Sequence, residues 1–123
     1  MTIAAIDFQT LANAGFPLAE YAPGDVIFAE GDPGDKMYVI RSGEVEILLD
    51  GRVLEVLKSG GIFGEMALID GAARVATARA KTACEVAPIS EKTFLFLVHE
   101  TPFFAIAVMR TLAGRLRRMD QAL

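Results

Sequence analysis

The chain has 123 residues, of which 53% are apolar, and it carries a formal net charge of −4 at pH 7. This length buries one sizeable hydrophobic core but not two ordinary ones, so we expect one domain that spans residues 1–123. The acidic balance argues against direct binding to nucleic acid, which requires a basic surface that displaces counterions from phosphate.

The N-terminal region has the composition of neither a secretory signal nor a membrane anchor. No Lys or Arg precedes Lys36, and the apolar runs are short. A secretory signal and a transmembrane helix therefore do not fit, and we expect a cytoplasmic protein that does not contact a membrane. The single cysteine, Cys84, has no partner for an internal disulfide, and its apolar neighbours indicate a small buried hydrophobe.

The first two thirds of the chain predict one short helix followed by strands. Apolar spacing in residues 7–14 indicates a helix within an N-terminal segment of residues 1–17. Residues 18–89 are short β-prone runs separated by turn signals with Gly, Pro and Asp. Asp50-Gly51 marks the clearest hairpin, because this pair tolerates positive φ. The regular spacing of these signals predicts a β-sandwich or jelly roll.

The last third, residues 90–123, changes to a helical period. Ser90 is a candidate cap for a helix that runs to about Glu100, and Thr101-Pro102 is a second start signal. The second helix has an apolar seam at alternating spacings of four and three, typical of a coiled coil. This seam consists of Ala105, Met109, Leu112, Leu116, Met119 and Leu123. We expect residues 102–123 to form a weak homodimer or to bind a partner protein.

Two motifs in the middle of the chain suit a ligand that carries a phosphate and hydroxyls. They are FGEMAL at residues 63–68 and RVAT at residues 74–77. Gly64 lets the backbone approach a ligand, and the run after it can form a helical turn whose free N–H groups face an anion. Arg74 would neutralise that anion with a planar fork. Glu65 cannot pair favourably with phosphate, so it is expected to accept hydrogen bonds from a sugar hydroxyl.

The order of these motifs resembles the phosphate-binding cassette of cyclic nucleotide-binding domains, here residues 63–77. Residues 79–87 and the helix after Pro102 resemble the sensor half of the catabolite activator family of bacterial regulators. The resemblance covers roughly residues 18–118. It implies a mainly β fold with flanking α: an eight-stranded jelly roll with a short N-terminal helix, a cassette helix and two C-terminal helices.

The resemblance also implies the ligand and its site. The ligand would be cyclic AMP, or else cyclic GMP, with no other cofactor and no metal. The residues that would bind it are Phe63, Gly64, Glu65, Met66, Ala67, Arg74, Val75 and Ala76. Four apolar strand residues either line the purine and ribose or only fill the core: Phe28, Ile47, Leu54 and Leu57. Arg115 either reaches across the pocket mouth or lies on a charged helix face.

The sequence departs from the family pattern at two places that concern nucleotide choice. Members selective for cyclic GMP have Thr directly after the cassette arginine, whereas this chain has Val75, which offers no hydroxyl. That difference favours cyclic AMP, because a site without a donor gains nothing from the polar edge of guanine. The catabolite activator offers Thr and Ser to adenine from its last helix, where this chain has Met119 and Asp120.

We expect a cyclic AMP sensor that signals occupancy by moving its C-terminal helix, and not an enzyme. Jelly-roll enzymes of the cupin type need several His and carboxylate ligands, and this chain has one histidine, His99. Two alternatives stay open. The first is an interaction module that keeps this fold without binding nucleotide. The second is a regulatory fragment of a transcription factor, channel or kinase regulator.

Overall fold

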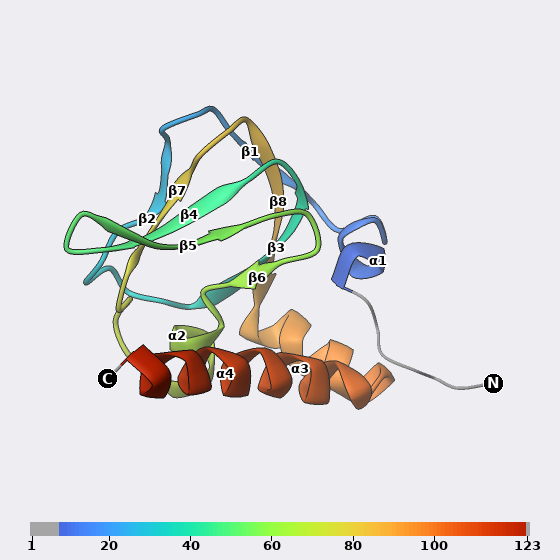
Figure 1. Ribbon diagram of the computed structural model, residues 1–123. Coiled ribbons are helices and arrows are strands. Elements are labelled where there is room, and N and C mark those ends of the chain that lie inside the picture. The colour runs from blue at the N-terminus through green and yellow to red at the C-terminus, as the bar shows by residue number, and fades with distance from the viewer. Residues whose placement is uncertain (1–7, 123) are drawn as a thin grey trace. The chain divides into compact units, whose positions relative to one another are not determined.

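The computed structural model describes the backbone of residues 8–122 and the side chains of residues 8–118. These residues form two compact units, residues 8–91 and residues 92–122, which are described separately below. The first unit contains the strands and the cassette motifs, and the second contains the C-terminal helices (Figure 1). The expectation of one domain over residues 1–123 stays a prediction.

Within residues 8–91, one short helix precedes eight strands, and a second short helix lies between the sixth and seventh strands. The helices are α1 (Phe8–Ala12) and α2 (Glu65–Asp70). The strands are β1 (Ala19–Tyr21), β2 (Val26–Phe28), β3 (Lys36–Ser42), β4 (Val45–Leu49), β5 (Arg52–Leu57), β6 (Ile62–Phe63), β7 (Thr77–Ala80) and β8 (Cys84–Ser90).

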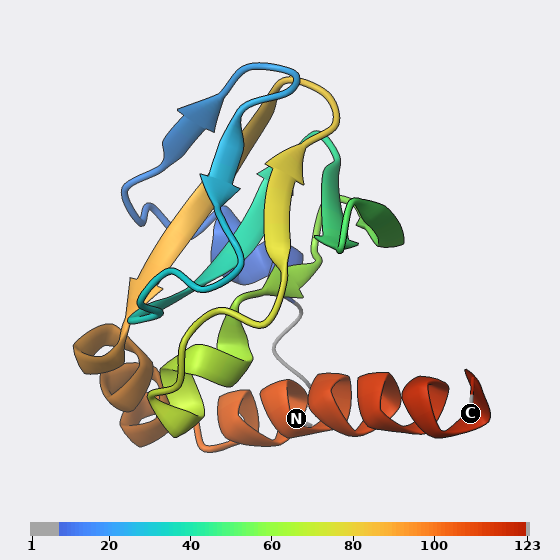
Figure 2. The same cartoon turned by 90° about the vertical axis from the view of Figure 1, so that its left-hand side faces the viewer.

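The strands form two antiparallel sheets of four strands each, which face one another (Figures 1 and 2). Their orders are β1-β8-β3-β6 and β2-β7-β4-β5, so strands that are neighbours in space are mostly distant in sequence. These two sheets confirm the predicted jelly roll. The predicted hairpin is also confirmed, since Asp50 and Gly51 have φ of 52° and 77° and β4 pairs with β5 on either side of them.

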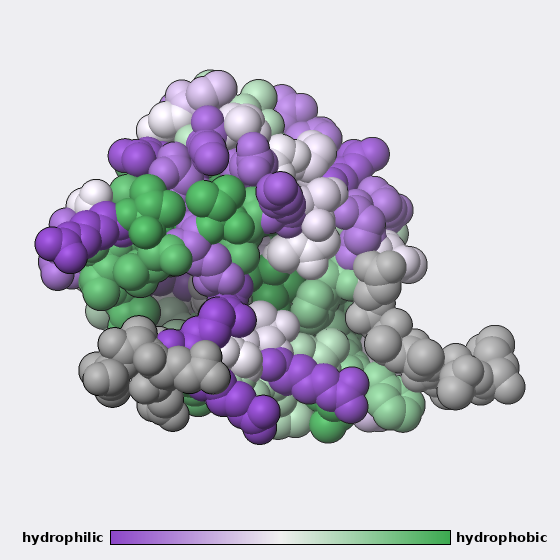
Figure 3. Space-filling model, in the orientation of Figure 1, coloured by the Kyte–Doolittle hydropathy of each residue, from purple (hydrophilic) through white to green (hydrophobic). Residues whose placement is uncertain are grey.

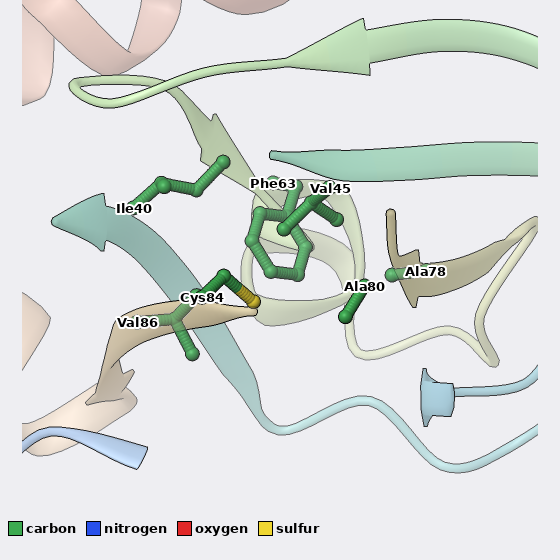
Figure 4. Packing of buried hydrophobic residues seen from close by; sticks show 7 residues of the cluster. All are labelled: Ile40, Val45, Phe63, Ala78, Ala80, Cys84 and Val86. Atoms are coloured by element: carbon green, nitrogen blue, oxygen red, sulfur yellow. The ribbon is translucent and has the colours of Figure 1, made fainter. Parts of the chain in front are cut away.

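The core of this unit lies between the two sheets (Figure 4). Alternate side chains of the strands point inward, as expected for two packed antiparallel sheets. The buried cluster consists of Ile40, Val45, Phe63, Ala78, Ala80, Cys84 and Val86. Cys84 is a buried free thiol, as predicted, and burial raises its pKa.

The β4–β5 hairpin leaves a group of apolar side chains exposed. Figure 3 shows apolar residues gathered over this hairpin, and the exposed ones are Leu49, Val53, Leu54 and Val56. β5 is an edge strand of its sheet. Leu54, one of the four residues predicted to line either a ligand or the core, is 61% exposed and therefore does not belong to the core.

The second unit contains α3 (Glu91–Glu100) and α4 (Phe103–Ala122). Ser90 directly precedes α3, as expected, whereas α4 begins one residue after Pro102, which lies in the turn between the helices. Phe94 and Phe104 join the two helices with an edge-on contact at 5.2 Å between ring centroids. No single described helix is long and apolar enough to cross a membrane; only α3 with residues 103–118 of α4, as a pair bent by 118°, has that length and composition.

The predicted seam only partly follows the buried face of α4. Phe104 and Val108 are buried, one position before Ala105 and Met109, and Met109 is 52% exposed. Leu116 of the seam is 55% exposed. The side chain of Met119 and all of Leu123 lie outside the described residues. Met109 and Leu116 are therefore available to another surface, whereas Ala105 and Leu112 are half-buried.

Candidate functional site

Two left-handed glycines delimit the cassette helix. Gly64 has φ of 79° and precedes α2, and Gly71 has φ of 71° and closes it by donating its N–H to the carbonyl of Ala67. No side chain caps the start of α2. Only Gly64 separates this six-residue helix from β6, and the backbone carbonyl of Gly64 accepts a hydrogen bond from the side chain of Arg74.

Arg74 is 5% exposed and is held by two backbone carbonyls. Its Nη1 donates to the carbonyl of Gly64 at 2.8 Å, and its Nη2 donates to the carbonyl of Lys36 at 2.6 Å. A Cβ at position 64 would lie only 2.8 Å from Nη1, so the approach of the guanidinium requires glycine there. Arg74 thus joins the start of α2 to the start of β3.

Aromatic rings cover one side of the same guanidinium. Its Cζ lies 4.0 Å from the ring centroid of Phe28 and 5.9 Å from that of Tyr38. Tyr38 stacks on Phe63 at 5.0 Å, and Phe28 lies 5.9 Å from each of these two rings. Three rings from β2, β3 and β6 therefore form one aromatic group beside Arg74.

The segment of residues 29–35 is fastened to the cassette by backbone hydrogen bonds. The N–H of Gly31 donates to the carbonyl of Arg74, and the N–H of Arg74 donates to the carbonyl of Asp32, both at 2.8 Å. A Cβ on Gly34 would lie 3.0 Å from Nε of Arg74, which shows how closely this segment packs. The sequence did not predict these two hydrogen bonds, because backbone groups of segments distant in sequence carry no local signature.

The electrostatics of the site are unusual for a protein interior. Among residues 8–118, Glu65 and Arg74 are the two buried charged side chains. Burial lowers the pKa of Arg74, while Tyr38 and the carboxyl groups of Asp35, Glu65 and Asp32 oppose that shift. None of the ion pairs in the described residues includes Arg74, and its buried Nε has no acceptor. An arginine held in this way can accept an anion, because its charge is not neutralised by a bound carboxylate.

The other predicted site residues take several positions. Ala67 is buried and Ala76 half-buried, whereas Met66 and Val75 are exposed, Val75 by 60%. Phe63 belongs to the core, and Phe28, Ile47 and Leu57 are among the half-buried residues that pack against it. Arg115 lies on α4 in the other unit, so its predicted reach to the pocket stays a prediction.

An open cleft elsewhere in the first unit is lined by Glu20, Tyr21, Ala22, Asp25, Ser42, Ala83, Cys84 and Glu85. Ser42 donates its hydroxyl to Glu85 there. Three carboxyl groups among its lining residues oppose an anionic ligand, and no cassette residue lines it. The cassette, with Arg74, is the candidate site for a phosphate.

The first unit is thus a jelly roll that buries an arginine beside a short helix. The family model described as "Cyclic nucleotide-binding domain" matches residues 18–101, so the chain belongs to this family. The resemblance seen in the sequence is confirmed.

Relatives and solved structures agree with this assignment. The cyclic AMP receptor protein of Thermus thermophilus is 36% identical over 115 residues, which cover 89% of this chain and 53% of that protein. A cAMP-dependent protein kinase regulatory subunit of Emericella nidulans is 44% identical over 89 residues, 70% of this chain and 20% of that protein. The chain spans about half or less of the length of these curated relatives.

Among solved structures, the Thermus thermophilus catabolite activator protein superimposes with a TM-score of 0.84 at 34% identity, over 99% of this chain and 60% of that one. The cyclic AMP-bound form of the EAL enzyme Bd1971 superimposes with a TM-score of 0.64 at 37% identity, over 83% of this chain and 29% of that one. These superpositions confirm the fold.

The arrangement predicts that Arg74 controls the ionisation of Tyr38. Burial raises the pKa of the Tyr38 phenol, and the Arg74 cation lowers it, because a positive charge favours the phenolate. Arg74→Gln should therefore raise the pKa of Tyr38 further, whereas Arg74→Lys, which keeps the charge, should raise it less. A spectrophotometric titration in a Tyr21→Phe background measures Tyr38 alone, since the chain has two tyrosines.

Circular dichroism at each pH is the control that the protein stays folded through this titration. A Tyr38 pKa that is equal in the wild-type, Gln and Lys backgrounds would contradict the placement of Arg74 beside this ring.

Proposed function

We propose that this chain is a cytoplasmic sensor that binds cyclic AMP in its β-roll and signals occupancy through movement of α4. The observation that carries the proposal is Arg74, a buried cation with no ion pair in the described residues and an N–H that has no acceptor. A phosphate oxygen is the kind of acceptor that such a group needs. The relatives named above support the choice of a cyclic nucleotide.

In the proposed complex, Arg74 pairs with the cyclic phosphate while the N–H groups near Met66 and Ala67 donate to its oxygens. Glu65, buried at the start of α2, accepts a hydrogen bond from the ribose hydroxyl. Binding then shifts a conformational equilibrium of α4 through a difference in affinity between two states. The proposal includes no catalytic step, metal or direct contact with nucleic acid.

Cyclic AMP is preferred over cyclic GMP in this proposal. Val75, directly after the cassette arginine, is exposed and has no hydroxyl for guanine. Both nucleotides are found with one relative, because Bd1971 has a cyclic AMP-bound form and a cyclic GMP-bound form. Isothermal titration of the wild-type chain with each nucleotide tests the proposal, and binding of neither would refute it.

The Arg74→Ala variant should bind cyclic AMP more weakly by about 2 to 4 kcal/mol, because a desolvated phosphate loses its charge-assisted partner. Isothermal titration measures this change. Arg79→Ala is the matched control, since Arg79 is a half-exposed arginine of the same unit that pairs with Glu46 at 3.5 Å. Equal affinity of a folded Arg74→Ala variant and the wild type would remove Arg74 from the site.

Glu65→Gln should weaken binding less than Arg74→Ala, because an amide oxygen still accepts a hydrogen bond although the charge is lost. The proposed partner is the ribose hydroxyl, so 2′-deoxy cyclic AMP should bind the wild type more weakly than cyclic AMP. Removal of the 2′-hydroxyl should lower the affinity of Glu65→Gln by less than it lowers that of the wild type. If the wild type binds both nucleotides equally, Glu65 has a different role.

A second candidate function is assembly through the C-terminal helices. The observation that favours it is the exposure of apolar side chains on α3 and α4 within the described residues. The exposed ones are Leu95, Phe96, Phe103, Ile106, Met109 and Leu116. We infer a weak dimer or a partner protein on this surface, because the seam has just under three heptads and places Ala and Met at key positions.

Leu116→Asp should shift the chain toward monomer in sedimentation over a concentration series, because it places a charge on an exposed seam position. Arg118→Asp is the control, since Arg118 is an exposed residue of α4 on the helix face opposite Met109. The series is measured with and without cyclic AMP. A wild type that stays monomeric at high concentration in both conditions would exclude the homodimer and leave a heterologous partner.

A further inference from the structure

Phe28 stands between the hydrophobic core and the buried arginine. It ends β2, where a register irregularity separates it from Val26. Its ring contacts the rings of Tyr38 and Phe63 at 5.9 Å each, and it packs against the core cluster. Beyond the ring lies the guanidinium of Arg74, 4.0 Å from the ring centroid. The core therefore supports the ring, and the ring supports the cation.

The contacts of Arg74 hold its position without neutralising its charge. Two carbonyls accept hydrogen bonds from Nη1 and Nη2, and these bonds restrain the edge of the planar group. The Phe28 ring restrains the group at 4.0 Å. An aromatic face attracts a cation electrostatically and does not carry a net charge, unlike a carboxylate. The positive charge therefore stays available to an anion.

A contact with the purine alone would not account for the position of the Phe28 ring against Arg74. The sequence left open whether Phe28 lines the nucleotide or fills the core, and the structure shows a third contact, with the phosphate-binding side chain itself. A Cβ on Gly64 would lie 3.3 Å from Phe28 Cε2, so the ring also borders the turn that starts α2. Phe28, Gly64 and Arg74 thus pack as one group.

We propose that Phe28 is a positioning residue for the ligand phosphate, which it serves by holding the guanidinium of Arg74 in place. This inference rests on the proposed function, because it assumes that Arg74 binds a cyclic nucleotide phosphate. Replacement of the ring by an aliphatic side chain removes the attraction to the cation and frees the guanidinium to turn about its bonds to the two carbonyls.

A double-mutant cycle separates this role from a purine contact. Phe28→Leu should weaken cyclic AMP binding about tenfold in the wild-type background, the size expected for a desolvated cation–π contact. In the Arg74→Ala background the same substitution should change affinity less than about twofold, because the group on which it acts is gone. Titrations followed by NMR reach the millimolar concentrations that the weak variants require.

Two controls address folding. Ile40→Val removes a methyl group from the buried cluster that Phe28 packs against and keeps the Phe28 ring, so it should leave the affinity unchanged. Phe28→Met replaces Phe28→Leu if the latter does not fold, since Met also lacks an aromatic face and fills irregular space well. Far-UV circular dichroism establishes folding before each titration.

A second measurement does not depend on the ligand. The Nε–H resonance of Arg74, assigned by its loss in Arg74→Lys, should show the ring-current shift of a proton near Phe28 and slow exchange with water. In Phe28→Leu the resonance should return toward its ordinary position and exchange faster. If the wild type binds no cyclic nucleotide, the proposed function fails, and this measurement still decides whether Phe28 holds Arg74.

Two results would overturn the proposal. An equal loss of affinity from Phe28→Leu in both backgrounds would mean that the ring contacts the nucleotide or only stabilises the fold. An unchanged affinity and an unchanged Arg74 resonance in a folded Phe28→Leu variant would mean that the carbonyls of Gly64 and Lys36 suffice to hold the guanidinium.

Discussion

The buried guanidinium of Arg74 is the interaction on which the rest of the site depends. Removing such a group from water costs several kcal/mol unless polar partners replace the solvent. Here the partners are the carbonyls of Gly64 and Lys36 together with the ring of Phe28. The arginine therefore ties four separate segments to one point, because its own backbone also bonds to residues 31 and 32.

The jelly-roll topology brings these segments together around Arg74. Its sheet orders place strands that are distant in sequence beside one another, so β2, β3 and β6 each contribute one ring to the aromatic group. The two sheets and their common core hold these rings in place. A rigid scaffold under a small polar site is the arrangement that keeps the entropic cost of binding low.

The sequence predicted the features that local physical chemistry determines. Asp50-Gly51 indicated the β4–β5 hairpin because few pairs accept two positive φ angles, and the cassette motifs identified Glu65 and Arg74, which the structure buries. It did not predict contacts between segments that are distant in sequence, or the exposure of every strand residue. The carbonyl of Lys36 has no sequence signature, the contact of Phe28 with Arg74 spans 46 residues, and Leu54 is exposed on the edge strand β5.

The use of backbone carbonyls as partners of Arg74 affects which substitutions the site tolerates. A carbonyl is the same in every residue type, so the side chain at position 36 can vary while its hydrogen bond to the guanidinium persists. The restriction falls instead on positions where a side chain would obstruct the path of the chain, above all Gly64 and Gly34, whose added Cβ atoms would meet Arg74. Within such a site, variation is limited by the space around the backbone more than by the chemistry of a partner side chain.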